Sequence, residues 1–141
     1  MNITQGQLPV RFDRKFHLSY VESHAQLLLR SGRGGYHRGQ TLRHDSVVDI
    51  LFKNVATLAL MESFIPLEIS LADEVEVEKF RRFLKCELGN RNLYALRGED
   101  GLGYVLAGAL YWVDDHDGST EEPSVLIATP ERSENMVVMR A

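Results

Sequence analysis

Short segments of alternating apolar and polar residues recur along this chain, and only one segment between them has the pattern of a helix. Alternation with a period of two is typical of half-buried strands, and a parallel sheet would need strands that alternate regularly with helices. The expected order here is several strands, one helix and then further strands. The sequence therefore predicts a mainly β, α+β fold: an antiparallel β barrel or sandwich of about eight strands, with the helix over one opening or face.

The expected strands differ in how many of their faces are apolar. Leu27, Leu28 and Leu29 follow one another, which is typical of a strand in the sheet interior. Residues 47–61 have helix as the alternative, because they are rich in Val, Leu and Ala; their β-branched content favours strands. A turn is expected at residues 22–25. The expected strands cover residues 15–21, 26–31, 46–52, 55–60, 65–71, 92–97, 103–113 and 124–129.

The single helix is expected from about residue 73 to residue 88, after the fifth strand. Asp73 can cap its first turn and Glu76, three residues later, can reach back as in a capping box. Gly89 stands where a left-handed C-terminal cap is expected. Phe80 and Leu84 occupy the centre of the apolar stripe, so both are predicted to be buried against a sheet.

The 141 residues are predicted to form a single domain, since 44% of them are hydrophobic and 26% are charged. Residues 1–12 and 130–141 are expected to be flexible or loosely attached termini. Residues 32–44 are expected to form a mobile Gly/Arg-rich surface loop, because glycine is frequent there. No apolar run approaches the roughly 20 residues of a spanning helix, the N-terminus does not resemble a signal peptide, and a lone cysteine cannot form an internal disulfide. We therefore expect a cytoplasmic protein that is not bound to a membrane.

Charge is distributed unevenly along the chain. Residues 1–60 hold eight Lys/Arg and four Asp/Glu, whereas residues 61–141 hold eight and sixteen. Residues 30–44 contain four arginines and no acid, and residues 98–131 contain eight acids and no Lys or Arg. Such asymmetry can indicate a partner surface. The alternative, which we favour, is that the basic and acidic stretches attract each other within the fold.

No motif with established chemistry is complete. The acidic residues 114–119 fail the calcium-loop register, because Val113 and Ser124 would fall where the first and last carboxylates are required. The five histidines lack zinc-site spacing, and the glycines at 32–35 are not followed by the Gly-Lys-Ser/Thr of a phosphate loop. The sequence thus assigns no catalytic residue, no metal ligand and no cofactor, and an enzyme is the less favoured interpretation.

Two segments carry a resemblance to known proteins. Residues 23–31 read Ser-His-Ala-Gln-Leu-Leu-Leu-Arg-Ser, and residues 48–55 read Val-Asp-Ile-Leu-Phe-Lys-Asn-Val. Together they resemble a family of small uncharacterised bacterial proteins in which an SHxQLLLRS motif precedes an xDIxFxxV segment. The resemblance implies a small bacterial cytoplasmic domain and no catalytic residue.

The leading hypothesis is a small non-enzymatic protein-binding module, immunity-like in the sense that an acidic domain neutralises a basic toxin by complementary charge. Its partner would be another protein, or a second copy through self-association. The candidate contacts are acids of the region 114–122 and arginines of the loop 32–44, namely Asp114, Asp115, Asp117, Glu121, Glu122, Arg33 and Arg38.

Two other functions remain open. The alternative is a small-molecule-binding domain or enzyme with a pocket in the barrel or under the helix, lined by aromatic residues such as Tyr94, Tyr104, Tyr111 and Trp112 together with a histidine. The third is weak nucleic-acid binding by the basic loop, which is ranked last because the net charge of −4 and the pI of about 5.7 oppose it.

Overall fold

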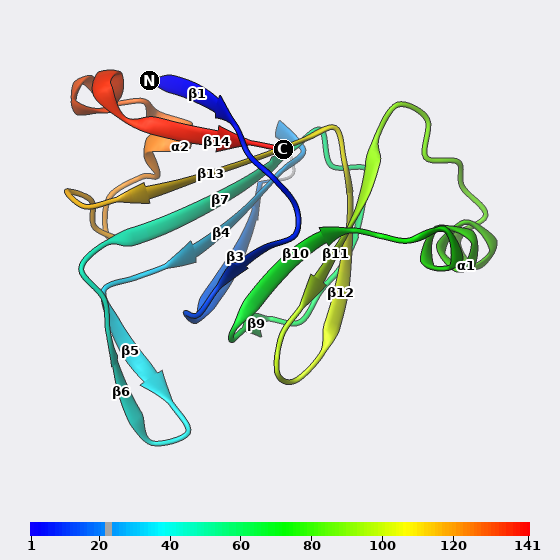
Figure 1. Ribbon diagram of the computed structural model, residues 1–141, viewed down its shortest axis with the longest axis horizontal. Helices are drawn as coiled ribbons and strands as arrows, with labels where there is room; N and C mark the ends of the chain where they lie inside the picture. Colours follow the sequence, from blue (N-terminus) through cyan, green and yellow to red (C-terminus); the bar gives the residue numbers. More distant parts are fainter. Residues whose placement is uncertain (22–23) are drawn as a thin grey trace.

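The computed structural model describes residues 1–21 and 24–141, so the first half of the turn expected at 22–25 lies outside the described residues. The fold is mainly β, with mostly antiparallel pairing, as predicted (Figure 1). In spatial order, the seven-stranded sheet contains β1 (Asn2–Gln5), β14 (Val137–Arg140), β13 (Ala109–Asp115), β7 (Val47–Lys53), β4 (Gln26–Ser31), β3 (Phe16–Val21) and β9 (Ser63–Phe64). The five-stranded sheet contains β2 (Val10–Phe12), β10 (Leu67–Leu71), β11 (Asn92–Arg97), β12 (Leu102–Ala107) and β8 (Thr57–Ala59).

The two larger sheets share one apolar core. Phe52 from the seven-stranded sheet meets Tyr94 from the five-stranded sheet edge to face, with ring centroids 5.3 Å apart. Leu29 and Leu96, one from each sheet, are both fully buried in the same cluster. Among residues 1–21 and 24–141, neither sheet closes on itself into a barrel.

The predicted strand at 103–113 is in fact two strands in different sheets. β12 ends at Ala107 and β13 begins at Ala109, and Gly108 carries the chain from the five-stranded to the seven-stranded sheet. The Gly108 N–H donates to the carbonyl of Lys53 at 3.0 Å, and a Cβ on Gly108 would lie 2.9 Å from the Asn54 side chain. A larger residue here would require the Asn54 side chain to move, and alternation along the strand could not indicate this close approach.

The long helix begins as predicted and ends earlier than predicted. In α1 (Glu74–Leu84), the Asp73 carboxylate accepts from the Glu76 N–H at 2.8 Å and the Glu76 carboxylate accepts from the Asp73 N–H, which confirms the capping box. Lys85, not Gly89, adopts the left-handed conformation that ends the helix. The early end lets Cys86 and Leu88 turn back onto the cluster around Phe80. Phe80 is buried as predicted, but Leu84 is 40% exposed, so its predicted burial is wrong.

A polar network joins α1 to the five-stranded sheet. Arg97 on β11 donates to Glu76 at 3.0 Å, and the Tyr104 hydroxyl on β12 donates to Glu76 at 2.6 Å. Burial and the hydrogen bond to the Glu76 carboxylate raise the pKa of Tyr104 to about 12. Glu76, which belongs to the capping box, therefore also attaches the first turn of the helix to the five-stranded sheet.

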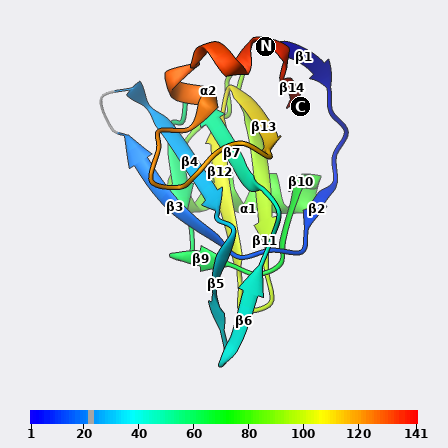
Figure 2. The ribbon, with the colours of Figure 1, turned by 90° about the vertical axis from the view of Figure 1, so that its left-hand side faces the viewer.

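The segment expected to be an irregular loop is a β-hairpin. β5 (Gly34–His37) pairs with β6 (Gln40–Arg43) as a two-stranded sheet that projects from the body of the molecule (Figure 2). Arg38 and Gly39 form the two-residue turn, with φ of 51° and 80°. Positive φ at both positions suits the right-handed twist of a hairpin. The frequent glycines predicted an irregular loop, but in the structure they are part of a regular hairpin and its turn.

The two ends of the chain, which were expected to be flexible or loosely attached, contain paired strands. β1 and β14 pair in parallel at one edge of the seven-stranded sheet, and β2 pairs with β10. Between the acidic region and β14 lie α2 (Val125–Ala128) and a 3₁₀ helix, Glu131–Asn135.

A short helix also replaces the strand predicted at 124–129. Ser124 caps α2 by accepting from the Leu126 N–H, and Val125 and Leu126 are both buried. Their adjacent burial suits a helix turn and not the alternation of a strand. In the part of the chain described, no helix has the length and apolar character needed to cross a membrane.

We expect Phe80→Ala to lower the free energy of unfolding by about 3 kcal/mol, because the ring packs with Leu93 and Leu106 between α1 and the sheet. Phe83→Ala is the matched control: Phe83 lies on the same helix but is 85% exposed, so its truncation should cost less than about 0.5 kcal/mol. Urea denaturation of both variants measures the difference. Equal midpoints would show that α1 is not attached through Phe80.

Candidate functional site

The acidic region predicted to bind a partner lies at the end of β13 and in the loop that follows it. Asp114, Asp117, Glu121 and Glu122 are exposed, whereas Asp115 is 2% exposed. The region therefore presents carboxylates to solvent at four of the five predicted positions. Asp115 does not belong to that surface.

Arg30 fastens the acidic loop to the seven-stranded sheet. On β4 it lies opposite Asp49 of β7, and its Nε donates to the buried Asp49 carboxylate at 2.7 Å. The rest of the guanidinium donates to the backbone carbonyls of Ser119, Thr120 and Glu122, the last at 2.6 Å. Arg30 therefore binds the backbone carbonyl of Glu122 and not its carboxylate.

Arg33 fastens the same loop from the base of the hairpin. Its guanidinium donates to the carbonyls of Gly118 at 3.1 Å and His116 at 2.5 Å, and to the carbonyl of Asp45. A guanidinium can bridge several acceptors in this way because its donors form a planar fork. The favoured alternative, that the basic and acidic stretches attract each other within the fold, is confirmed by Arg38, which pairs with Glu99 and Asp100 of the stretch 98–131. Arg30 and Arg33 bind backbone carbonyls of the same stretch. Arg33 is a support of the acidic loop and is already engaged there.

Arg38 lies elsewhere, at the tip of the hairpin. It pairs with Glu99 at 2.7 Å and with Asp100 at 3.1 Å, in the turn between β11 and β12. The structure therefore does not bring Arg38 to Arg33 or to the acidic loop.

Asp115 anchors the start of the loop through hydrogen bonds with Arg132 and with the backbone of Asp117. Both of its carboxylate oxygens accept from Arg132, at 2.7 and 2.9 Å, and one also accepts from the Asp117 N–H. Burial alone would raise the pKa of Asp115, but the hydrogen bonds from Arg132 and the Asp117 N–H, with the Arg132 charge, hold the pKa below its usual range. Gly118 is required close by, since a Cβ there would lie 2.2 Å from the Asp115 carboxylate.

Three residues of the site were missed from the sequence: Arg14, Asp49 and Arg132. Arg14 donates to the hydroxyls and carbonyls of Ser31 and Ser46 and is half-buried. Burial lowers the pKa of Arg14, nearby Asp114 opposes this and Arg33 reinforces it. In the sequence, Asp49 is the one charged residue within the apolar pattern of residues 47–52, and this could have indicated a buried ion pair. The sequence contains no comparable signal for Arg14 or Arg132.

An open cavity of about 500 Å³ adjoins the acidic loop. Its apolar walls are formed by Trp112 and Val48 from the seven-stranded sheet, by Phe12 from β2, and by Met136, Val137 and Met139. Asp114 and Arg14 supply its polar end.

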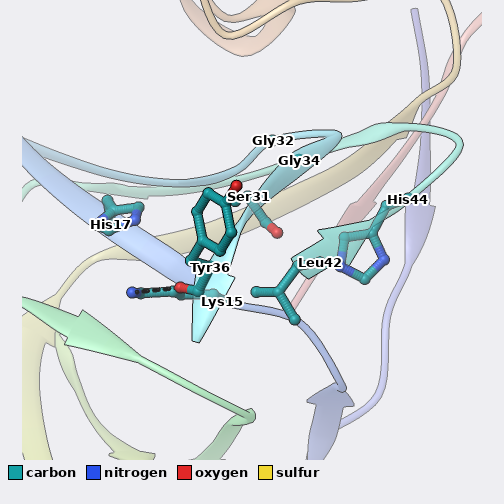
Figure 3. Close-up of a pocket in the computed structure, with 9 residues that line it drawn as sticks. Lys15, His17, Ser31, Gly32, Gly34, Tyr36, Leu42 and His44 are labelled. Carbon is teal, nitrogen blue, oxygen red and sulfur yellow. Dashed lines mark hydrogen bonds between the residues drawn. The ribbon is translucent and has the colours of Figure 1, made fainter. Parts of the chain in front are cut away.

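A smaller cavity of about 80 Å³ lies between the hairpin and β3 (Figure 3). Figure 3 shows His17 and His44 on opposite sides of it, with Tyr36 and Leu42 between them. Lys15 donates to the Tyr36 carbonyl at 3.2 Å, and the buried Nε2 of His44 has no hydrogen-bond partner among residues 1–21 and 24–141. Burial and nearby Arg14 lower the pKa of His44, although Asp45 opposes them. The basic groups do not converge on one point, so they form no acid–base pair.

The aromatic residues of the small-molecule hypothesis do not surround a common pocket. Tyr94 is buried in the core and donates to the Ala141 carbonyl, Tyr104 binds Glu76, and Tyr111 lies beneath Lys53 and Arg140. Trp112 alone lines the cavity beside the acidic loop. Among the described residues, no group of three or more His, Cys, Asp or Glu is placed to hold a metal ion.

Comparison with known proteins found no matching family model, no matching curated protein and no matching solved structure. The resemblance of residues 23–31 and 48–55 to a bacterial family thus stays a prediction.

We expect Asp115→Asn to lower the free energy of unfolding by about 2 kcal/mol at neutral pH, because it replaces a charge-assisted pair with Arg132. The folded-state pKa of Asp115 lies below its unfolded value of about 3.9, so this stabilisation is present above that pH and is lost as the pH falls through the folded-state value. The variant should therefore lose less stability than the parent on acidification. Urea denaturation from pH 7 to pH 3 measures this; parallel pH profiles would contradict the assignment.

Proposed function

We propose that this chain is a protein-binding module that recognises a positively charged surface of its partner through the acidic region 114–122. The observation that carries the proposal is the way the loop is held: Arg30 and Arg33 bind its backbone carbonyls and leave exposed carboxylates outside. Binding then requires little ordering of the loop, which lowers its entropic cost.

The surrounding fold supports a binding role over catalysis. A shared apolar core lies between the two larger sheets, and the antiparallel packing fits a two-layer sandwich. The acidic groups are arranged at the surface, where complementary charge speeds association and selects among partners. An immunity-like protein, which neutralises a basic toxin, is one function of this kind.

The nucleic-acid hypothesis has less support. Arg30 and Arg33 donate to the chain's own carbonyls and Arg38 pairs with two acids, so these groups would have to exchange their present partners for phosphates. Phosphate contacts dominate affinity for nucleic acids.

A fluorescently labelled lysine-rich peptide tests the proposal. We expect Glu121→Gln/Glu122→Gln to weaken its binding about fivefold at low ionic strength, from the loss of two exposed ion pairs. Glu62→Gln/Glu74→Gln is the matched control, because it removes the same charge from exposed sites outside the acidic region. Fluorescence anisotropy titrations give both dissociation constants. An equal loss in the two variants would show that only net charge attracts the peptide.

A second candidate function is supported by an apolar cavity of about 370 Å³ between α1 and β8. Phe80, Phe83 and Leu84 line its helix side, and Thr57 and Leu58 line its strand side. A small apolar ligand could bind there, as the hypothesis of a pocket under the helix requires.

We expect Phe83→Ser to weaken binding of an apolar dye such as anilinonaphthalene sulfonate at this cavity, since the exposed ring is part of the wall. Ile127→Ser is the matched control, because Ile127 is also an exposed apolar residue but lies on α2. Dye fluorescence titrations compare the two, and unchanged binding in Phe83→Ser would remove this candidate.

A further inference from the structure

The cavity beside the acidic region offers an apolar surface that the contacts of the loop do not explain. Trp112, 8% exposed, and Val48, 4% exposed, contribute to its walls, and Phe12 meets the indole edge to face at a centroid distance of 6.4 Å. Met136 and Met139 contribute flexible side chains, and Val137 is 55% exposed. Its volume of about 500 Å³ is large enough for an aromatic or large aliphatic side chain.

The structure around Trp112 keeps this cavity in shape. A Cβ on Gly6 would lie 2.4 Å from the far edge of the indole, so the backbone at Gly6 packs directly against the ring. Gly6 is also fixed, because its N–H donates to the Arg140 carbonyl at 2.7 Å. The indole is therefore positioned by the pairing of the two chain ends.

The cavity and the acidic region meet at Asp114. Asp114 lines the cavity, and the exposed carboxylates of Asp117, Glu121 and Glu122 follow in the adjoining loop. Arg14 lines the same end, but its guanidinium is occupied by oxygens of Ser31, Gly32 and Ser46. His116 lies 3.5 Å from Asp114 and adds positive charge only when protonated.

We propose that the cavity lined by Trp112, Met136 and Met139 is the anchor pocket for one large apolar side chain that sits within a basic segment of the partner. This inference rests on the proposed function, because the acidic region supplies the attraction for the flanking basic residues. A well-packed central anchor with a polar rim is the usual arrangement of the residues that dominate interface energetics.

Trp112 is the only tryptophan of the chain, so its emission reports directly on occupancy. Two short peptides serve as probes: lysines flanking one central leucine, and lysines flanking one central alanine. We expect the leucine peptide to bind about tenfold more tightly than the alanine peptide and to shift the Trp112 emission, since burying the larger side chain adds favourable apolar contact.

The variants separate the pocket from the acidic surface. Val137→Lys places a charge at the exposed edge of the pocket and should abolish the preference for leucine and the emission shift. Val75→Lys is the matched control, because Val75 is an exposed valine on α1, 62% exposed against 55% for Val137. It should retain both signals.

Three other results of the peptide titrations would each contradict either the anchor pocket or the proposed function. Equal binding of the two peptides, weakened by Glu121→Gln/Glu122→Gln, would leave the acidic surface standing and overturn the anchor pocket. No binding of either peptide at low ionic strength would overturn the proposed function. A leucine preference that survives Val137→Lys would place the apolar contact outside this pocket and so overturn the inference.

Discussion

The ion pair between Arg30 and Asp49 is the contact on which the acidic surface depends. The Asp49 side chain is fully buried, and an unpaired carboxylate there would be costly. β4 and β7 place Arg30 directly opposite it, so the sheet register itself supplies the partner. Because the same guanidinium also binds three carbonyls of the loop after β13, one side chain joins the core to the surface. The register of β4 and β7 therefore also determines where the loop after β13 is held.

The basic stretch meets the acidic half of the sequence through backbone acceptors at residues 116–122 and through side-chain pairs at the hairpin tip, where Arg38 binds Glu99 and Asp100. Arg14 and Arg33 donate mainly to carbonyls and hydroxyls, and only Arg132 uses a carboxylate of the acidic region, Asp115. The guanidinium groups of Arg30 and Arg33 consequently bind the loop backbone, and most acids of the region face solvent. Because the arginines bind the loop backbone and the acids face solvent, the surface formed by the acidic region carries more negative charge than the net charge of −4 alone would indicate.

Local signals in the sequence predicted those parts of the fold that local physics determines. The capping box at Asp73 and Glu76, the strand character of residues 47–53 and the burial of Phe80 are confirmed. The exchange of sheets at Gly108 was not predicted, because it depends on Asn54, which lies across from the glycine and not beside it in the sequence. The two-residue turn at Arg38–Gly39 was not predicted, because the density of glycines was interpreted as irregular structure although positive φ at Arg38 and Gly39 suits a hairpin. The helix end at Lys85 likewise depends on Cys86 and Leu88 reaching a distant cluster.

The candidate site was predictable to a similar extent, since charge counting located the acidic region but could not separate Asp115 from its neighbours. That separation follows from strand alternation, which turns Asp114 to solvent and Asp115 toward Arg132. It could be read only once β13 was known to continue to Asp115, beyond the predicted end at residue 113.

The same periodicity explains why fold and surface cannot vary independently here. A slip of one residue between β4 and β7 would move every side chain of one strand to the other face, and Arg30 would then leave both Asp49 and the loop. The register is protected against such a slip by Leu27 and Leu29, which would lose their places in the shared core. Apolar packing on one face of β4 thereby fixes the guanidinium on the other face, and through it the position of the acidic loop. The position of the acidic loop is thus a consequence of core packing.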